Sequence, residues 1–198
     1  MAYNLPTNVT PGATGHTALH NQTNVAVNDL DARATAIEGS AARQIFIPAA
    51  QFSIVSGTPL LTSAAPVAWQ RWLLDPGSTE IVNTAIVPPL GWTTATARIH
   101  WSSESTQTGS AVIQFRALPV KNNGDTLTSG EASQQLTLAA PAQSVLSVND
   151  FPTAINVSTA DPLNRPLLQF SIRRLGADAA DTYPNDISLI GVSLIKAS

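Results

Sequence analysis

A heptad pattern near the N-terminus is the feature that most constrains this chain. Between Gly15 and Gly39, alternating steps of four and three residues place one set of side chains on a narrow seam of a helix: His16, His20, Thr23, Val27, Leu30, Ala34 and Ile37. An isolated helix cannot bury so narrow a seam, whereas identical helices from other copies of the chain can bury it. The pattern therefore predicts a short helical bundle that joins several copies of the chain.

The seam leaves the number of copies open. Val27 at an a position with Leu30 at a d position suits a dimer, whereas Ile37 at a d position favours a trimer. A helix of about three heptads is marginal on its own. We therefore expect the neighbouring domain to help hold the assembly together.

Two histidines on the seam raise a metal-binding alternative. His16 and His20 lie one helical turn apart, and several copies of one imidazole around an axis could hold a metal ion, a chloride or a water molecule. Thr17 stands where the HExxH motif of a metalloprotease needs a glutamate. We expect instead that the two rings pack together and set the helix register, as buried polar residues at a and d positions do. No metal site and no cofactor are assigned.

An extended arm is predicted before the helix. Residues 1–15 are rich in Asn, Thr, Pro and Gly, and proline favours extended backbone around it. We expect this arm to anchor the chain on a partner surface through Tyr3, Leu5 and Val9. The predicted organisation is then an arm (1–15), a helix that joins copies of the chain (16–39) and a third part (40–198).

The third part has the pattern of an all-β domain. Short alternating segments are separated by Gly, Pro, Asn, Asp and Ser, and no second helix is indicated. The strand candidates are 43–49, 50–55, 66–74, 80–89, 94–102, 110–120, 150–158, 166–176 and 187–197. The last of them is apolar on both faces, so we expect it to be central or at a subunit interface. The fold class predicted for the whole chain is mainly β: an arm and a short coiled-coil helix followed by a jelly-roll β-sandwich.

Composition excludes several functions. Charged residues make up 12% of the chain, against about 25% in a typical domain. The net charge of −3 and the lack of a basic run argue against a nucleic-acid partner. The chain has no cysteine, and we find neither a signal-peptide pattern nor an apolar run long enough for a membrane span.

Catalytic and calcium-binding patterns are weak. A GxSxG motif is missing, and His100 is expected to be a surface residue or an interface hydrogen-bonding group rather than a catalytic base. The loop that carries Asp178, Asp181 and Asp186 could hold calcium, but it lacks the spacing of an EF-hand. A solvated loop whose side chains form turns is the favoured interpretation.

Aromatic residues offer a possible glycan site. Trp69 and Trp72 fall on opposite faces of one predicted strand, so one of them is expected to be exposed or at an interface. Trp92 follows a Pro-Pro turn and is predicted to cap the sandwich or to line a groove, and Tyr183 lies in the acidic loop. Packing in the core is the alternative for each ring.

Two segments resemble proteins of tailed bacteriophages. Residues 15–39, GHTALHNQTNVAVNDLDARATAIEG, resemble the Gly-His-x-x-x-His-Asn element and Asn-rich trimerising helix that open many tail-fibre, head-fibre and capsid-decoration proteins. Residues 167–197, LLQFSIRRLGADAADTYPNDISLIGVSLIKA, are similar to the closing strands of their jelly-roll head domains. The resemblance implies a homotrimer that is assembled in the host cytoplasm and located in the virion.

The sequence-based function hypothesis is a non-enzymatic virion protein. It would be a homotrimeric capsid-decoration or head-fibre protein, anchored by its arm to the major capsid protein or another virion component. The alternative is a tail-fibre protein that recognises a host surface glycan through Trp92 or Tyr183. A sugar-cleaving depolymerase would need a pair of facing carboxylates, and no recognisable signature of one is present.

Overall fold

The computed structural model describes residues 43–64, 69–89, 91–120, 132–157 and 167–197, together with residue 25 and residues 27–29. The chain divides into two compact units, Met1–Arg43 and Gln44–Ser198. In the first unit residue 25 and residues 27–29 are helical, Arg43 lies in a bend, and Val27 belongs to the predicted seam. The other seam residues, including His16 and His20, and the whole predicted arm lie outside the described residues. Nowhere in the described part does a helix have the length and hydropathy that a membrane crossing requires.

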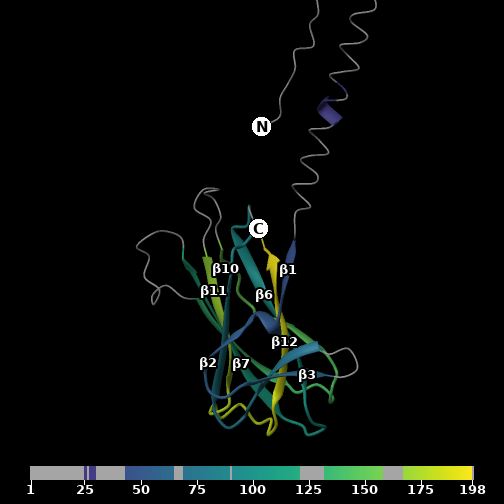
Figure 1. The fold of residues 1–198 in the computed structure, drawn as a ribbon, viewed down its shortest axis with the longest axis vertical. Helices are drawn as coiled ribbons and strands as arrows, with labels where there is room; N and C mark the ends of the chain where they lie inside the picture. The colour runs from purple at the N-terminus through teal and green to yellow at the C-terminus, as the bar shows by residue number, and fades with distance from the viewer. Residues whose placement is uncertain are drawn as a thin grey trace, which may run out of the picture. The chain divides into compact units, whose positions relative to one another are not determined.

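The second unit is a sandwich of two antiparallel β-sheets (Figure 1). Its elements are β1 Gln44–Pro48, a 3-10 turn Ala49–Gln51, β2 Ser53–Ser56, β3 Leu60–Ala64, β4 Trp69–Leu74, β5 Thr79–Ile86, β6 Thr94–Ser103, β7 Ser110–Val120, β8 Ala132–Ala139, β9 Ser147–Asp150, β10 Ile155–Asn156, β11 Leu167–Leu175 and β12 Ile187–Lys196. The prediction of a mainly β sandwich is confirmed.

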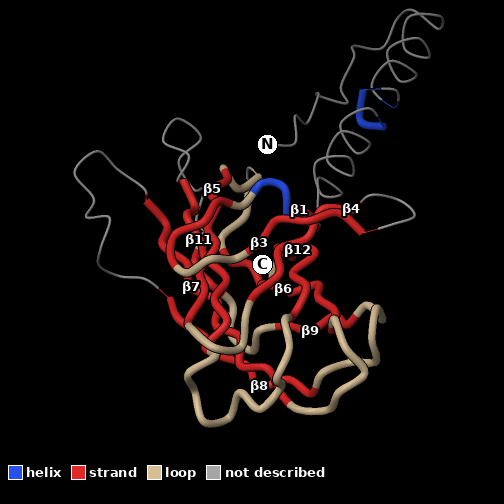
Figure 2. Tube along the Cα trace, turned by 60° about the horizontal axis from the view of Figure 1, so that its bottom comes forward, coloured by secondary structure: helices blue, strands red, loops and turns tan. Residues whose placement is uncertain are grey.

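Seven strands form one sheet and five form the other. The seven-stranded sheet runs β10-β6-β12-β4-β3, with β1 also paired to β12 and β9 also paired to β6. The five-stranded sheet runs β2-β5-β11-β7-β8. Figure 2 shows β5, β11 and β7 together on one side of the sandwich and β1, β12 and β6 on the other. The chain crosses repeatedly between the sheets, as it does in a jelly roll.

Alternation along the strands produces the core. Ala95, Ala97, Ile99 and Trp101 of β6 are all buried, as the sequence predicts, while the residues between them lie on the opposite, partly exposed face. From the other sheet, the Phe115 ring packs 5.3 Å from the ring of Phe151 and 5.6 Å from that of Phe170, centroid to centroid. Burial of these two inner faces accounts for the sandwich.

The prediction that the last strand is central is confirmed. β12 hydrogen-bonds to β6 along one side and to β4 and β1 along the other. The sequence-based strand list omits β3, β8 and β9. In β8 the side chains are at best half-buried on one face and exposed on the other, which gives a weak apolar pattern.

The loop from Gly176 to Asp186 is held by a buried arginine. Arg174 Nη2 donates to Asp181 Oδ1 at 2.8 Å, and Arg174 Nε donates to Asp181 Oδ2 at 3.0 Å. The same guanidinium donates to the carbonyl oxygens of Leu74, Asn185 and Tyr183. The expectation of a fully solvated loop is therefore wrong at Asp181, whose side chain is paired inside the sandwich.

Candidate functional site

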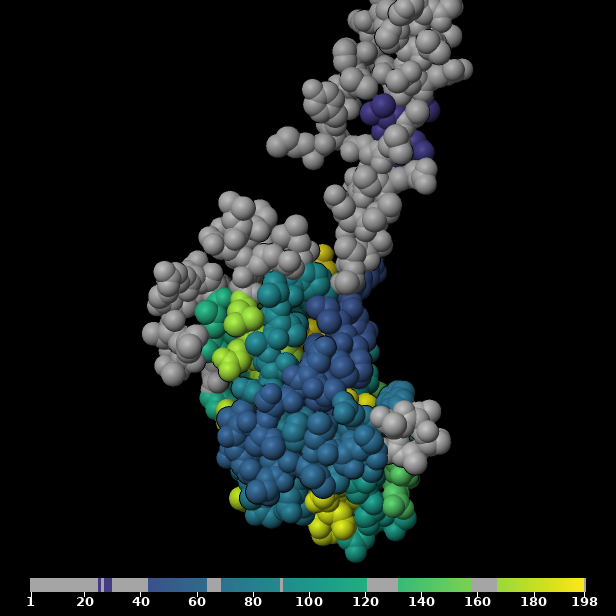
Figure 3. All heavy atoms as spheres, in the orientation of Figure 1, coloured from purple at the N-terminus to yellow at the C-terminus, as the bar shows by residue number. Residues whose placement is uncertain are grey.

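A groove opens on the surface of the seven-stranded sheet where β12 changes partner. β12 pairs with β4 through Ile187, Ser188 and Leu189, and with β1 from Gly191 onward. Between these two partners lies a groove of about 560 Å³, lined by Phe46, Pro48, Ala50, Ser63, Trp69, Gln70 and Ile190. Sites for small molecules usually enclose about 300–1,000 Å³, so the groove is of a size that holds such a ligand. Figure 3 shows that the early strands, in blue, form much of the front surface of the sandwich.

Trp69 is the more exposed of the two aromatic residues that line the groove, the other being Phe46. Its side chain is 58% exposed, whereas Trp72, three residues on, is 5% exposed and donates its indole N–H to the carbonyl oxygen of Ala49 at 2.9 Å. The expectation that one of the two rings is exposed is thus confirmed. An exposed indole presents a large apolar face and an N–H donor to a ligand.

Gly191 shapes the wall of the groove that β1 forms. A Cβ atom on Gly191 would lie 2.5 Å from the carbonyl oxygen of Ile47 and 2.6 Å from the Phe46 ring. The missing side chain therefore lets β1 and the Phe46 ring lie close against β12. The Phe46 ring in turn meets His100 edge to face, with centroids 5.2 Å apart. These contacts hold the wall of the groove that β1 forms.

His100 lies behind this wall and has a structural role. Its Nε2 atom is 2.9 Å from Ser193 Oγ, and Gln44 donates to the same hydroxyl at 2.8 Å. Burial lowers the pKa of His100, and the positive charge of Arg98 adds to this effect. Asp150 bonds to Arg98 rather than to the histidine, at 2.9 Å for the Nη2–Oδ2 pair. The described residues around His100 therefore do not form a serine–histidine–aspartate triad.

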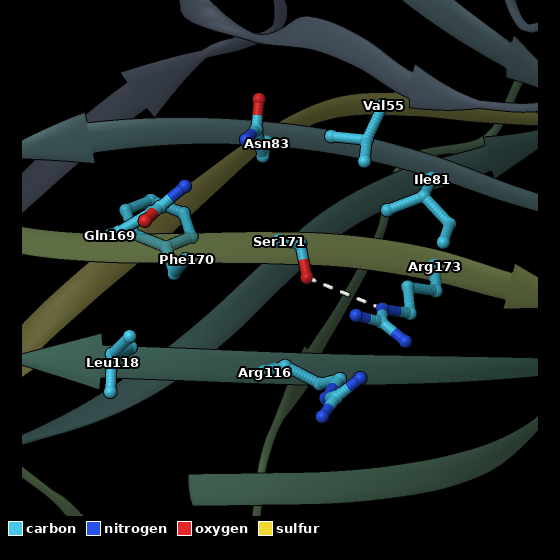
Figure 4. A pocket seen from close by; sticks show the side chains of 9 residues that line it. All are labelled: Val55, Ile81, Asn83, Arg116, Leu118, Gln169, Phe170, Ser171 and Arg173. Carbon is cyan, nitrogen blue, oxygen red and sulfur yellow. Dashed lines mark hydrogen bonds between the residues drawn. The ribbon is translucent and has the colours of Figure 1, made fainter. Parts of the chain in front are cut away.

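A second hollow lies on the outer face of the five-stranded sheet (Figure 4). It has a volume of about 160 Å³ and is lined by Val55, Ile81, Asn83, Arg116, Leu118, Gln169, Phe170, Ser171 and Arg173. Strand register explains the gathering, because Ser171 of β11 faces Asn83 of β5 on one side and Arg116 of β7 on the other. Most of its side chains are polar.

The two aromatic residues proposed for glycan binding are in the core. Trp92 is 1% exposed and Tyr183 is 0% exposed, so neither ring can stack on a sugar. The Tyr183 hydroxyl accepts from the Ser105 N–H at 3.0 Å, and Arg174 Cζ lies 5.8 Å from the centre of its ring. The prediction for Trp92 and Tyr183 is corrected here, because both rings pack in the hydrophobic core, and Arg174 also donates to the carbonyl oxygen of Tyr183.

The calcium alternative also finds no support in the acidic loop. Asp181 is committed to Arg174, and the Asp178 carboxylate accepts hydrogen bonds from the Ala180 N–H at 2.9 Å and from Gln135 at 3.3 Å. Asp178 thus forms the turn that the sequence predicts. Within the part of the chain that the structure describes, no three acidic or histidine side chains are grouped as metal ligands.

Sequence reasoning missed most of both sites. Phe46, Gln70 and Arg173 were not singled out, although the stretch LLQFSIRRL alternates polar and apolar residues and so places Gln169 and Arg173 on one face. That alternation was the available signal for the hollow. The groove has no local signal, because β1 and β4 meet only through their shared partner β12.

Comparison with family models and with curated proteins finds no match. Among solved structures, the Cry4Aa toxin of Bacillus thuringiensis is 9% identical over 78% of this chain, with a TM-score of 0.50, and the match covers 24% of the toxin. A family 35 carbohydrate-binding module from Clostridium thermocellum is 11% identical, with a TM-score of 0.47, over 79% of this chain and 100% of the module. Tailspike protein 4 of bacteriophage CBA120 is 6% identical over 78% of this chain and 20% of the tailspike, with a TM-score of 0.39. The likeness to the toxin shows a shared fold alone, and the two lower scores carry no argument about function.

Proposed function

We propose that the β-sandwich binds a saccharide in the groove beside Trp69. The observation that carries this proposal is an indole that is 58% exposed at the edge of a groove which also holds Gln70 and Ser63. A sugar ring has an apolar C–H face, which an indole can cover, and hydroxyl groups, which amide and hydroxyl side chains can bond. Binding is proposed without cleavage, since glycoside hydrolysis needs two carboxyl groups and none is present among the described lining residues.

We place this module in a homotrimeric virion protein of a tailed bacteriophage. The support is the resemblance of residues 15–39 and 167–197 to virion appendage proteins, together with the heptad seam. Three joined sandwiches would present three grooves to a host surface glycan. Linked sites gain avidity over one site when the ligand can reach more than one of them.

The test is a binding screen on surface polysaccharides. Trp69→Ala removes the aromatic face and should weaken the best saccharide at least tenfold by calorimetry, which corresponds to about 1.4 kcal/mol. Leu146→Ala is the matched control, because this exposed apolar residue does not line the groove. The proposal would be wrong if the two variants bound equally, or if no saccharide bound to the full chain.

A second candidate function is capsid decoration. The observation that favours it is a set of exposed apolar side chains on and around edge strands of the sandwich: Ile54, Val55, Leu60, Leu61, Val145, Leu146 and Val148. Apolar surface of this kind is typical of surfaces that other subunits cover. In this role the arm, with Tyr3, Leu5 and Val9, would dock on the capsid, and binding to the assembled shell would stabilise it by mass action.

Capsid decoration is tested by adding the purified chain to particles that lack it. A rise in the capsid melting temperature that depends on the added concentration would support this role. Loss of that rise on removal of residues 1–15 would support docking by the arm. An unchanged melting temperature at saturating protein would rule decoration out.

A further inference from the structure

We propose that the hollow on the five-stranded sheet binds a sugar residue that bears a carboxylate, with the guanidinium of Arg173 as the partner of the negative charge. This site is separate from the groove beside Trp69, because the hollow lies on the other sheet and shares no lining residue with the groove. It is therefore a second binding site, which stands or fails independently of the first.

Most N–H donors of the Arg173 guanidinium have no hydrogen-bond partner among the described residues. A guanidinium carries five N–H donors in a planar fork. Among the described residues, the Arg173 side chain makes one hydrogen bond, a long one of 3.4 Å from its Nε to Ser171 Oγ. By contrast, Arg71, Arg98 and Arg174 each bind a carboxylate of the chain itself. Arg173 thus presents the two-pronged edge that matches a carboxylate.

The surroundings of Arg173 favour an anion. Arg116 lies on the neighbouring strand, two residues from Gln114, which is the partner of Arg173, and Figure 4 shows both side chains at the same end of the hollow. Burial lowers the pKa of Arg173, and the positive charge of Arg116 lowers it further. The described lining residues include no acidic side chain. A bound carboxylate would offset both unfavourable effects on the guanidinium.

The rest of the hollow matches a sugar rather than a bare ion. Asn83, Gln169 and Ser171 supply neutral amide and hydroxyl groups, which can bond several sugar hydroxyls at once. Ile81 and Leu118 add apolar surface for a ring face. The volume of about 160 Å³ is close to that of cavities of about 150 Å³ that hold one benzene ring, so the hollow accommodates part of a pyranose, which is larger than benzene.

The experiment compares acids with their own methyl esters. The full chain is titrated with oligosaccharides of galacturonate, glucuronate and N-acetylneuraminate, and with the methyl ester of each, which keeps the hydroxyls and removes the charge. At least one acid should bind at least tenfold more tightly than its ester, since hydrogen bonds to a charged group are roughly twice as strong as those between neutral groups. Added salt should weaken binding of the acid more than binding of the ester.

Variants then locate the site. Arg173→Gln should remove the preference for the acid, and Arg173→Lys, which keeps the charge, should retain part of it. Arg98→Gln removes an arginine from the other sheet, outside the hollow, and should leave the preference for the acid unchanged. Acid and ester binding equally, no acid in the panel binding, or an unchanged preference in Arg173→Gln would each overturn the inference. Competition by sodium acetate at the same concentration as the uronate would overturn the assignment to a sugar.

Discussion

The carboxylate of Asp181 forms a two-pronged ion pair with the guanidinium of Arg174, and both side chains are fully buried. Asp181 Oδ2 also accepts from the Val112 N–H at 3.0 Å, so the pair ties the end of β11 to β7 and to the loop before β12. A buried pair of this kind is tolerated only when every remaining donor is bonded. Here the carbonyl oxygens of Leu74 and Tyr183 complete the arrangement.

Asp181→Asn should destabilise the sandwich strongly. The change leaves a buried guanidinium without its counter-charge, and breaking such a pair costs about 3–5 kcal/mol. Chemical denaturation should show this loss as a lower midpoint. Asp178→Asn is the matched control in the same loop, and it should cost much less because its partners lie at the surface. Equal losses in the two variants would contradict the role given to Asp181.

Stability should fall as the pH drops below about 6.5, the usual pKa of histidine. Because the pKa of His100 is lowered in the folded chain, the unfolded chain binds more protons between that lowered pKa and 6.5. The free energy of unfolding therefore decreases with falling pH in this window. Denaturation midpoints at pH 7.5 and 5.5 should differ less in His100→Gln than in the wild type. An identical pH dependence in both would show that His100 does not contribute.

Gly191→Ala should loosen the wall of the groove. The new Cβ would collide with the backbone of Ile47, so β1 must move away from β12. Such overpacking costs about 1–3 kcal/mol, and amide exchange should become faster in β1. Gly91→Ala is a control for backbone strain alone, because Gly91 has a φ of 79° and a Cβ there would meet nothing within 4 Å. Unchanged exchange in β1 of Gly191→Ala would contradict the packing argument.

Leu30→Asp should convert the proposed trimer to monomers. It places a charge from every copy on the predicted seam, where the charges would repel one another in the assembly. Light scattering measures the mass directly. Asn28→Asp adds the same charge away from the seam and should leave the mass unchanged. A Leu30→Asp variant that stays fully oligomeric would remove the helix from the account.

Local alternation made much of the fold predictable. The buried faces of β6 and β7 and the central place of β12 follow from patterns within ten or so residues, because side chains of a strand alternate between faces. Arg174 carried a similar signal, since it falls on the apolar face of LLQFSIRRL. A charge at such a position indicates a buried partner.

The groove, unlike the hollow, could not be predicted from alternation along one strand. The groove depends on Phe46 of β1 and Trp69 of β4, two strands that pair with different parts of β12, and the pairing of Phe46 with Ser193 spans most of the domain. Trp92 and Tyr183 are possible glycan-binding residues by sequence, with core packing as the alternative, and the structure shows that both rings fill the core. Strand order, rather than any local pattern, decides which side chains meet.

The central claim is tested most directly by the indole N–H signals of the four tryptophans in an NMR titration with the saccharide selected by the binding screen. Trp72, Trp92 and Trp101 are at most 5% exposed, so their signals should stay in place while that of Trp69 shifts in proportion to binding. Saccharide binding that leaves the Trp69 signal unmoved would contradict the account.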